Sequence, residues 1–216
     1  MLATFVHRAI DFVVPPSCAG CDAPVRHPRL WCLECADSVA PLPQRPFPCT
    51  EQGYRVICPF AYGGPVANAI HRLKFTRRPE LAGILASPVV EKLRTLELLH
   101  DSLLVPVPST LERIVERGYN QSALLALAIA RKASLKCLPL ALERTHFAPH
   151  QMGADKTQRA AQVAGAFEAV DRRLANSSVI LVDDVVTTGA TSAACATALE
   201  AIGAHVIGIA AIARVL

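Results

Sequence analysis

Two adjacent aspartates and a run of threonines follow one hydrophobic segment of this 216-residue chain. The stretch from Val179 to Thr191 reads VILVDDVVTTGAT. It predicts a strand, two carboxylates at its carboxyl end, a short loop and a helix start, which is where open α/β sheets bind ligands. The backbone N–H groups of the helix start and the hydroxyls of Thr187, Thr188 and Thr191 would bind a phosphate group, and Gly189 permits its close approach.

Asp183 and Asp184 cannot bind phosphate themselves, because like charges repel. Their natural partners are ribose hydroxyls and a divalent cation, so a ribose 5-phosphate that carries both would satisfy the whole segment. The alternative is that the two acids only cap the following helix and that the threonines are ordinary turn formers. The order of two acids, two threonines and a glycine after a hydrophobic strand favours the sugar phosphate.

Four of the eight cysteines form two CxxC pairs, CAGC and CLEC, with ten residues between them. Two such pairs can bring four thiolates to one tetrahedral zinc ion. With four thiolates no position is left open for water, so the zinc would be structural. His27 between the pairs is a less favoured ligand, and a redox role is disfavoured because neither pair follows a strand in a βαβ pattern. The predicted ligands are Cys18, Cys21, Cys32 and Cys35.

Proline divides the chain into two predicted domains. The segment PLPQRPFP from Pro41 to Pro48 cannot continue a helix or a central strand and predicts a linker. Residues 1–50 would then hold an N-terminal amphipathic helix over residues 1–16, the double zinc-ribbon module and the linker. Residues 51–216 would form the larger domain.

The elements expected in the larger domain alternate between strands and helices. We expect strands over 54–62, 103–107, 178–182 and 205–213, and helices over 66–75, 80–98, 121–132 and 188–202. A polar loop, SxxxR followed by RGYNQ, is expected after the second strand, and a functional loop over 144–158. The chain is 52% hydrophobic but only 5% aromatic, which favours a mostly parallel sheet with flanking helices.

The bulk composition narrows the class of protein. The formal charge of +4 suits anionic ligands or weak contact with nucleic acid without requiring either. No uncharged apolar run approaches the roughly 18 residues of a membrane span, and the first 16 residues lack the features of a secretory signal. We therefore expect a cytoplasmic protein without a membrane partner.

The whole chain resembles the ComF family, whose members are also called GntX-like, competence-associated phosphoribosyltransferase-like proteins. The resemblance rests on the cysteine pairs, on VILVDDVVTTGAT and on several shorter motifs. These are LKF (73–75), VPVP (105–108), RGYNQ (117–121), Gln151, Arg159 and GAF (165–167). It implies an α/β type I phosphoribosyltransferase fold behind a zinc ribbon with four cysteine ligands.

The resemblance also implies roles for particular residues. The two aspartates, Asp183 and Asp184, would contact ribose and Mg²⁺ of phosphoribosyl pyrophosphate (PRPP), and Arg117 and Lys74 would hold its diphosphate. Lys74 could equally be a surface cation. The PRPP-binding set is Asp183, Asp184, Val185, Thr187, Thr188, Gly189, Ala190, Thr191, Lys74 and Arg117, of which Asp183, Asp184 and Arg117 would be catalytic.

Two positions depart from the family pattern. Some members carry a third cysteine pair, whereas here Gln52 stands where a partner for Cys49 is expected. Members usually have Arg, two residues and then Asn before GAF, whereas Arg159 is followed by Gln162. The amide is kept but its reach changes.

The activity that the resemblance implies is transfer of a phosphoribosyl group from PRPP to an unidentified acceptor, with release of pyrophosphate. One alternative is a PRPP or nucleotide sensor, or an assembly partner in DNA uptake, that keeps the phosphate site without turnover. Another is an accessory protein that binds single-stranded DNA, for which Trp31 is the one aromatic residue of the ribbon. Contact with competence proteins and a homodimer are further partner expectations.

Overall fold

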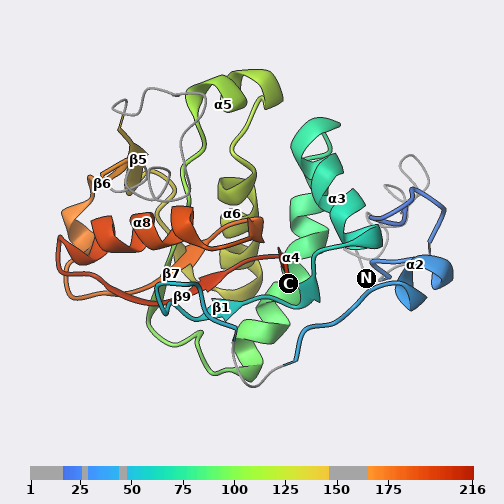
Figure 1. The fold of residues 1–216 in the computed structure, drawn as a ribbon, viewed down its shortest axis with the longest axis horizontal. Helices are drawn as coiled ribbons and strands as arrows, with labels where there is room; N and C mark the ends of the chain where they lie inside the picture. The colour runs from blue at the N-terminus through green and yellow to red at the C-terminus, as the bar shows by residue number, and fades with distance from the viewer. Residues whose placement is uncertain (1–16, 26–28, 44–47, 146–164) are drawn as a thin grey trace, which may run out of the picture.

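The computed structural model describes residues 17–25, 29–43, 48–145 and 165–216, which form an α/β fold (Figure 1). The predicted amphipathic helix over residues 1–16 and all but the start of the expected loop 144–158 lie outside these ranges. In chain order the elements are α2 (Leu33–Asp37), β1 (Val56–Ile57), β2 (Phe60–Ala61), α3 (Gly64–Phe75), α4 (Glu80–Thr95), β3 (Ser102–Pro106), α5 (Leu111–Arg117), α6 (Gln121–Ala133), β4 (Lys136–Cys137), β5 (Leu142–Arg144), β6 (Phe167–Ala169), the 3₁₀ turn η1 (Arg172–Leu174), β7 (Ser178–Val182), β8 (Val185–Val186), α8 (Ala190–Glu200), β9 (His205–Ala210) and β10 (Ala213–Arg214).

Within the described ranges the central sheet has five strands in the order β1-β9-β7-β3-β4, and every pair of neighbours in it is parallel. Strand β7 lies in the middle, and its residues 179–182 are fully buried. Side chains that alternate along a strand point to opposite faces. Accordingly Ile180 and Val182 belong to one hydrophobic core, and Val179 and Leu181 belong to the other.

Helices cover both faces of this sheet, as the hydrophobic composition predicted. The apolar faces of α3, α4 and α6 bury one core, and α8 buries the other (Figure 1). In the first core, α3, α4 and α6 each contribute fully buried side chains, among them Leu73, Leu85 and Ile129. The expected fold class, a mostly parallel sheet with flanking helices, is confirmed.

A second, three-stranded parallel sheet in the order β2-β10-β8 adjoins the carboxyl ends of the central strands. It forms because the two longest predicted strands are each broken. Pro59, which lacks an N–H group, lies in the first break, between β1 and β2. As a result, β10 pairs with β8, the short strand that begins directly after the two aspartates.

The polar loop expected after the second strand is wrong in its first part, because Leu111–Arg117 forms the helix α5. The Thr110 side chain accepts a hydrogen bond from the backbone N–H of Arg113 and caps the start of this helix. Gly118 ends it in the left-handed conformation, with φ of 88°. Both capping residues are of types that also occur in loops, so the sequence of this segment was compatible with either a loop or a helix.

The cysteine module packs beside α3, where its short helix α2 is visible (Figure 1). On either side of residues 44–47, which lie outside the described ranges, the backbone forms isolated β-bridges. Pro41 bridges to Phe60 and Cys49 to Arg55. Among the described helices none is both long and apolar enough to cross a membrane.

Candidate functional site

Asp183 and Asp184 lie where β7 leaves the sheet. The backbone N–H of Asp183 still donates to the carbonyl of Ala210 on β9, at 2.9 Å. Its Oδ1 accepts hydrogen bonds from the Ser122 hydroxyl at 3.0 Å and from the backbone N–H of Asp184 at 2.8 Å. The start of α6 thus holds the first carboxylate in a single orientation.

The environment of Asp183 disfavours its charge. Burial, followed by the neighbouring negative charge of Asp184, raises the pKa of Asp183 to about 7. The hydrogen bonds from the Asp184 N–H and from Ser122, and the positive charge of Lys74, act in the opposite direction. A cation bound between the two carboxylates would remove their repulsion and favour the ionised form.

Lys74 supplies a positive charge to the second carboxylate. Its Nζ lies 2.9 Å from Oδ2 of Asp184, whose side chain is only 5% exposed. Lys74 is in the last turn of α3, whereas Asp184 follows β7, so the fold brings them together from distant parts of the chain. The structure therefore places Lys74 at the predicted site and not on an outer surface.

The predicted phosphate loop connects β8 to α8. Val185 begins β8, and Ala190 begins α8. Gly189 between them has φ of 84°, a backbone conformation that residues other than glycine rarely adopt. A Cβ atom on Gly189 would lie 2.2 Å from Cγ2 of Thr50. The loop is therefore closed against residue 50, which is nearly fully buried.

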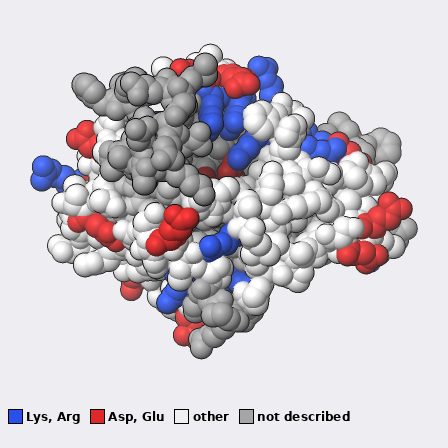
Figure 2. Space-filling view, viewed as in Figure 1, with Lys and Arg blue, Asp and Glu red and all other residues white. Residues whose placement is uncertain are grey.

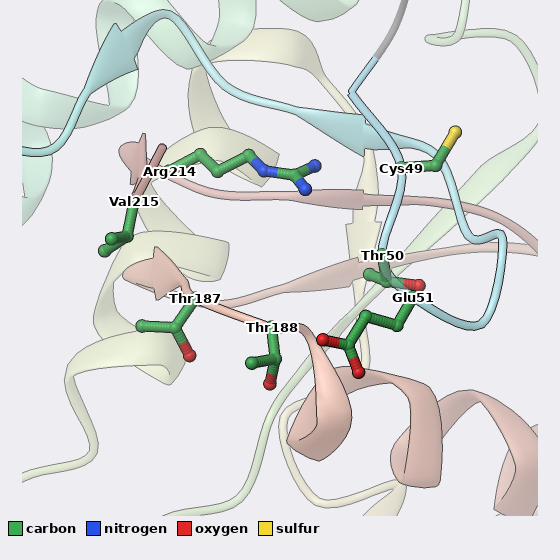
Figure 3. Close-up of a pocket in the computed structure, with 7 residues that line it drawn as sticks. All are labelled: Cys49, Thr50, Glu51, Thr187, Thr188, Arg214 and Val215. Atoms are coloured by element: carbon green, nitrogen blue, oxygen red, sulfur yellow. The ribbon is translucent and has the colours of Figure 1, made fainter.

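Residues 49–51 line the outer side of this loop and form part of a pocket of about 370 Å³ (Figure 3). Figure 3 shows Thr187 and Thr188 on one side, with the Glu51 carboxylate near the start of α8. The backbone N–H of Ala190 donates to Oγ1 of Thr188 at 3.3 Å. The pocket is lined by Cys49, Thr50, Glu51, Thr187, Thr188, Arg214 and Val215.

Arg117, the third predicted catalytic residue, is buried near the end of α3. The residue is 7% exposed, and its Nη1 donates to Oε1 of Gln121 at 2.9 Å. The guanidinium carbon lies 4.7 Å from the centre of the Phe75 ring, and Nε has no hydrogen-bond partner among the described residues. This unpaired donor fits an anionic ligand better than a purely structural role.

Lys and Arg side chains gather around a hollow near α3 and α5, and atoms of Asp or Glu residues are visible at its floor (Figure 2). The Lys74–Asp184 pair and Arg117 come from the elements that meet there. Lys74 forms an ion pair with Asp184, and the charges of both residues act on Asp183. Thr187 and Thr188 line the pocket of Figure 3 instead, and Thr191 is exposed on α8. A surface of this kind offers separate places for cationic and anionic parts of a ligand.

The four predicted zinc ligands also meet. Their Sγ atoms all lie within 4.8 Å of one another, and those of Cys21 and Cys32 are 3.6 Å apart. A tetrahedral zinc ion with bonds of about 2.3 Å requires sulfur atoms about 3.8 Å apart. Although burial raises it, backbone N–H groups of the module lower the pKa of Cys18 to about 7, whereas burial and the neighbouring thiols raise the pKa of Cys35. A bound metal ion would favour the thiolate form of both. The residues therefore fit a zinc site with four cysteine ligands.

No family model matched the chain. The DNA utilization protein YhgH of Escherichia coli K12 is 30% identical to it over 203 residues, which are 92% of this chain and 84% of the relative. The chain belongs to the ComF/GntX-like family. Competence protein F of Haemophilus influenzae is 28% identical over 91% of this chain and 90% of its own length, and competence protein ComFC of Bacillus subtilis is 28% identical over 61% and 52%.

Among solved structures, one described as the allosteric regulatory enzyme of purine biosynthesis has a TM-score of 0.43 with this chain. The two are 17% identical, and the match covers 66% of this chain and 30% of the other.

The short motifs of the ComF/GntX-like resemblance lie in elements around the site. LKF ends α3, VPVP spans the end of β3, RGYNQ joins α5 to α6, and GAF leads into β6. Gln151, Arg159 and Gln162 lie outside the described residues. In the RGYNQ motif, the Tyr119 hydroxyl donates to the carbonyl of Leu73 at 2.6 Å, so this motif also supports the end of α3.

Three residues at the site escaped the sequence analysis. Ser122 orients Asp183, Thr50 closes the loop at Gly189, and Phe75 covers the guanidinium of Arg117. Ser122 directly follows RGYNQ, and Phe75 ends LKF, so adjacency to a motif was an available signal. Nothing near Thr50 in the sequence indicates its contact with a loop so far along the chain.

Proposed function

We propose that the protein binds PRPP together with Mg²⁺ and transfers its phosphoribosyl group to an acceptor, with release of pyrophosphate. The observation that carries this proposal is the pairing of Lys74 with Asp184 beside Asp183, at the carboxyl end of the central strand and directly before the loop at Gly189. The two carboxylates could then bind a ribose, the lysine a diphosphate on one side of it, and the start of α8 a phosphate on the other side.

Each part of PRPP has a complementary group in this arrangement. The 5-phosphate would accept hydrogen bonds from the backbone N–H groups and hydroxyls of residues 187–191. The ribose hydroxyls would donate to Asp183 and Asp184, and the diphosphate would lie toward Lys74 and Nε of Arg117, which has no hydrogen-bond partner in the described part of the chain. Several charge-assisted bonds, each contributing roughly 1.5 to 3 kcal/mol, would anchor the substrate.

The carboxylates of Asp183 and Asp184 suit Mg²⁺, which prefers oxygen ligands and commonly shares them with a substrate phosphate. When bound, the ion supplies positive charge to the diphosphate as its bond to ribose weakens. Lys74 and Arg117 add fixed positive charge on the same side. The two carboxylates hold the ribose, so the residues act by orientation and charge stabilisation.

In the transfer itself, the bond between ribose C1 and the diphosphate oxygen breaks, and its electron pair leaves with pyrophosphate. The acceptor nucleophile forms a new bond to C1 and gives up a proton. Positive charge accumulates on the ribosyl group between these events, so exclusion of water from the site would prevent hydrolysis.

The relatives' names support a second proposal, in which this PRPP-binding site serves competence and DNA uptake as a sensor or assembly component without turnover. The names contain the words DNA utilization and competence and do not name a transferase. Single-stranded DNA binding through the zinc module has less support, because the Trp31 ring packs edge-on against Phe60 with centroids 5.9 Å apart.

One experiment separates transfer from sensing. Zinc-loaded protein is incubated with PRPP, Mg²⁺ and pools of nucleobases and amines, while PRPP binding is measured by calorimetry and pyrophosphate release by a coupled assay. Transfer predicts release that depends on both an acceptor and Mg²⁺. Binding without acceptor-dependent release would reject transfer and support sensing, and absence of binding would reject both.

A further inference from the structure

Helix α3 joins the zinc module to the predicted PRPP site through residues on opposite sides of its last turn. Arg72 and Lys74 are two positions apart, and a helix turns about 100° per residue, so their side chains point in nearly opposite directions. Lys74 reaches Asp184 at 2.9 Å. Arg72 reaches the cysteine module, and the fully buried Leu73 between them anchors the turn in the core.

Arg72 contacts the first CxxC pair, residues 18–21, and the residue after it; we call this pair the zinc knuckle. Its Nη1 donates to the backbone carbonyls of Cys18 at 3.5 Å and Ala19 at 3.4 Å, and its Nη2 forms an ion pair with Asp22. Asp22 lies directly after the ligand Cys21 and also pairs with Arg78. One side chain thus binds both ends of the segment that carries the first two zinc ligands.

The knuckle also packs tightly on the first turn of the same helix. A Cβ atom on Gly20 would lie 2.8 Å from Cβ of Pro65, which is too close for a real contact. Ala19 is fully buried in the core that α3 shares with α4 and α6. The module therefore touches α3 at both its beginning and its end.

We propose that the zinc knuckle acts as a fixed support for α3 and that Arg72 is a positioning residue, which holds the last turn so that Lys74 reaches Asp184. The inference rests on the proposed function, because it assigns the zinc module a part in PRPP affinity. Without this support, the Tyr119 bond to Leu73 and the core still hold the helix, but its last turn loses the contacts on its outer side.

The test is a double-mutant cycle of Mg²⁺-dependent PRPP affinity, because two residues that act through one contact have non-additive effects. Arg72→Ala is expected to weaken binding about fivefold and Lys74→Met about tenfold. If Arg72 acts through Lys74, the double variant weakens binding only about tenfold. A product of the two effects, about fiftyfold, would overturn the proposal.

Matched variants exclude a general loss of structure. Arg72→Lys keeps the charge and should retain part of the effect, whereas Arg94→Ala removes an exposed arginine of α4 that pairs with Glu91 and should leave affinity unchanged. Zinc content and the melting temperature are measured for every variant. A loss of affinity with Arg94→Ala equal to that with Arg72→Ala would also overturn the assignment.

A second readout does not depend on PRPP. Hydrogen exchange of the ligand-free protein should become faster in the last turn of α3 in Arg72→Ala, and also in wild-type protein stripped of zinc, while α8 keeps its protection. Unchanged exchange in α3 would overturn the inference even if PRPP binds. Failure of wild-type protein to bind PRPP would instead overturn the proposed function, and the exchange measurement would still decide whether the knuckle supports α3.

Discussion

Lys74 Nζ lies 2.9 Å from Oδ2 of Asp184, and this ion pair joins the end of α3 to the end of the central strand. The lysine compensates the negative charge of Asp184, which lies next to the second carboxylate, that of Asp183. Buried ion pairs recover their desolvation cost only partly, so such a pair is often kept for a purpose other than stability. In the proposed PRPP site this pair would hold a cation ready for the diphosphate, while Asp183 accepts a hydrogen bond from the hydroxyl of Ser122.

Replacing Asp184 by asparagine should weaken Mg²⁺-dependent PRPP binding by about tenfold or more, because a ligand for the ion and the partner of Lys74 are lost together. Calorimetric titrations with and without Mg²⁺ measure the effect. Asp171→Asn is the control, because that carboxylate pairs with the exposed Arg173 in a different part of the chain. Unchanged affinity in Asp184→Asn would contradict the assignment.

The raised pKa of Asp183 predicts a particular pH dependence of stability. Its pKa of about 7 in the folded protein exceeds the ordinary value of 3.8, so the folded state binds this proton more tightly. The resulting stability is complete below about pH 4 and is lost as the pH rises through about 7. Between pH 5 and 7, wild-type protein should lose roughly 2 kcal/mol relative to Asp183→Asn, as measured by urea unfolding without Mg²⁺. Parallel pH profiles of the two proteins would refute this.

The local pattern predicted the central strand and its neighbours closely. The strand over 178–182 is β7 at the predicted bounds, and the helix expected over 121–132 is α6 with one further residue. These segments have strong periodicity and clear ends, which makes them recognisable without tertiary context. The cysteine cluster was equally accessible, because the spacing of two CxxC pairs specifies the geometry of its metal.

Contacts between distant segments were out of reach of such patterns. Lys74 was as consistent with a surface cation as with a ligand-binding residue until the fold placed it against Asp184. Thr50 is separated from Gly189 by most of the larger domain, yet its methyl group fills the space that a side chain at Gly189 would need. Chain topology, and not local propensity, determines these two pairings.

Substitution of Gly189 by alanine should therefore be unusually harmful. The new side chain meets two obstacles, a φ of 84° and an overlap with Thr50. Gly203→Ala is a matched control, because Gly203 has nearly the same φ, 85°, but open space around its Cα. We expect a loss of about 1 kcal/mol in Gly203→Ala and roughly 2–4 kcal/mol in Gly189→Ala from urea unfolding. Equal losses would show that Thr50 moves aside without cost.

The cysteine cluster predicts one zinc ion per chain, and Cys32→Ser should lose it because three thiolates and a hydroxyl bind zinc far less tightly. Metal binding contributes on the order of 10 kcal/mol to folding in small zinc peptides, so the described part of the module over residues 17–43 should lose protection from hydrogen exchange before β7 does. Cys137→Ser is the control, since Cys137 lies on β4 outside the cluster. Elemental analysis of chelator-free protein gives the stoichiometry, and full zinc content in Cys32→Ser would reject the four-cysteine site.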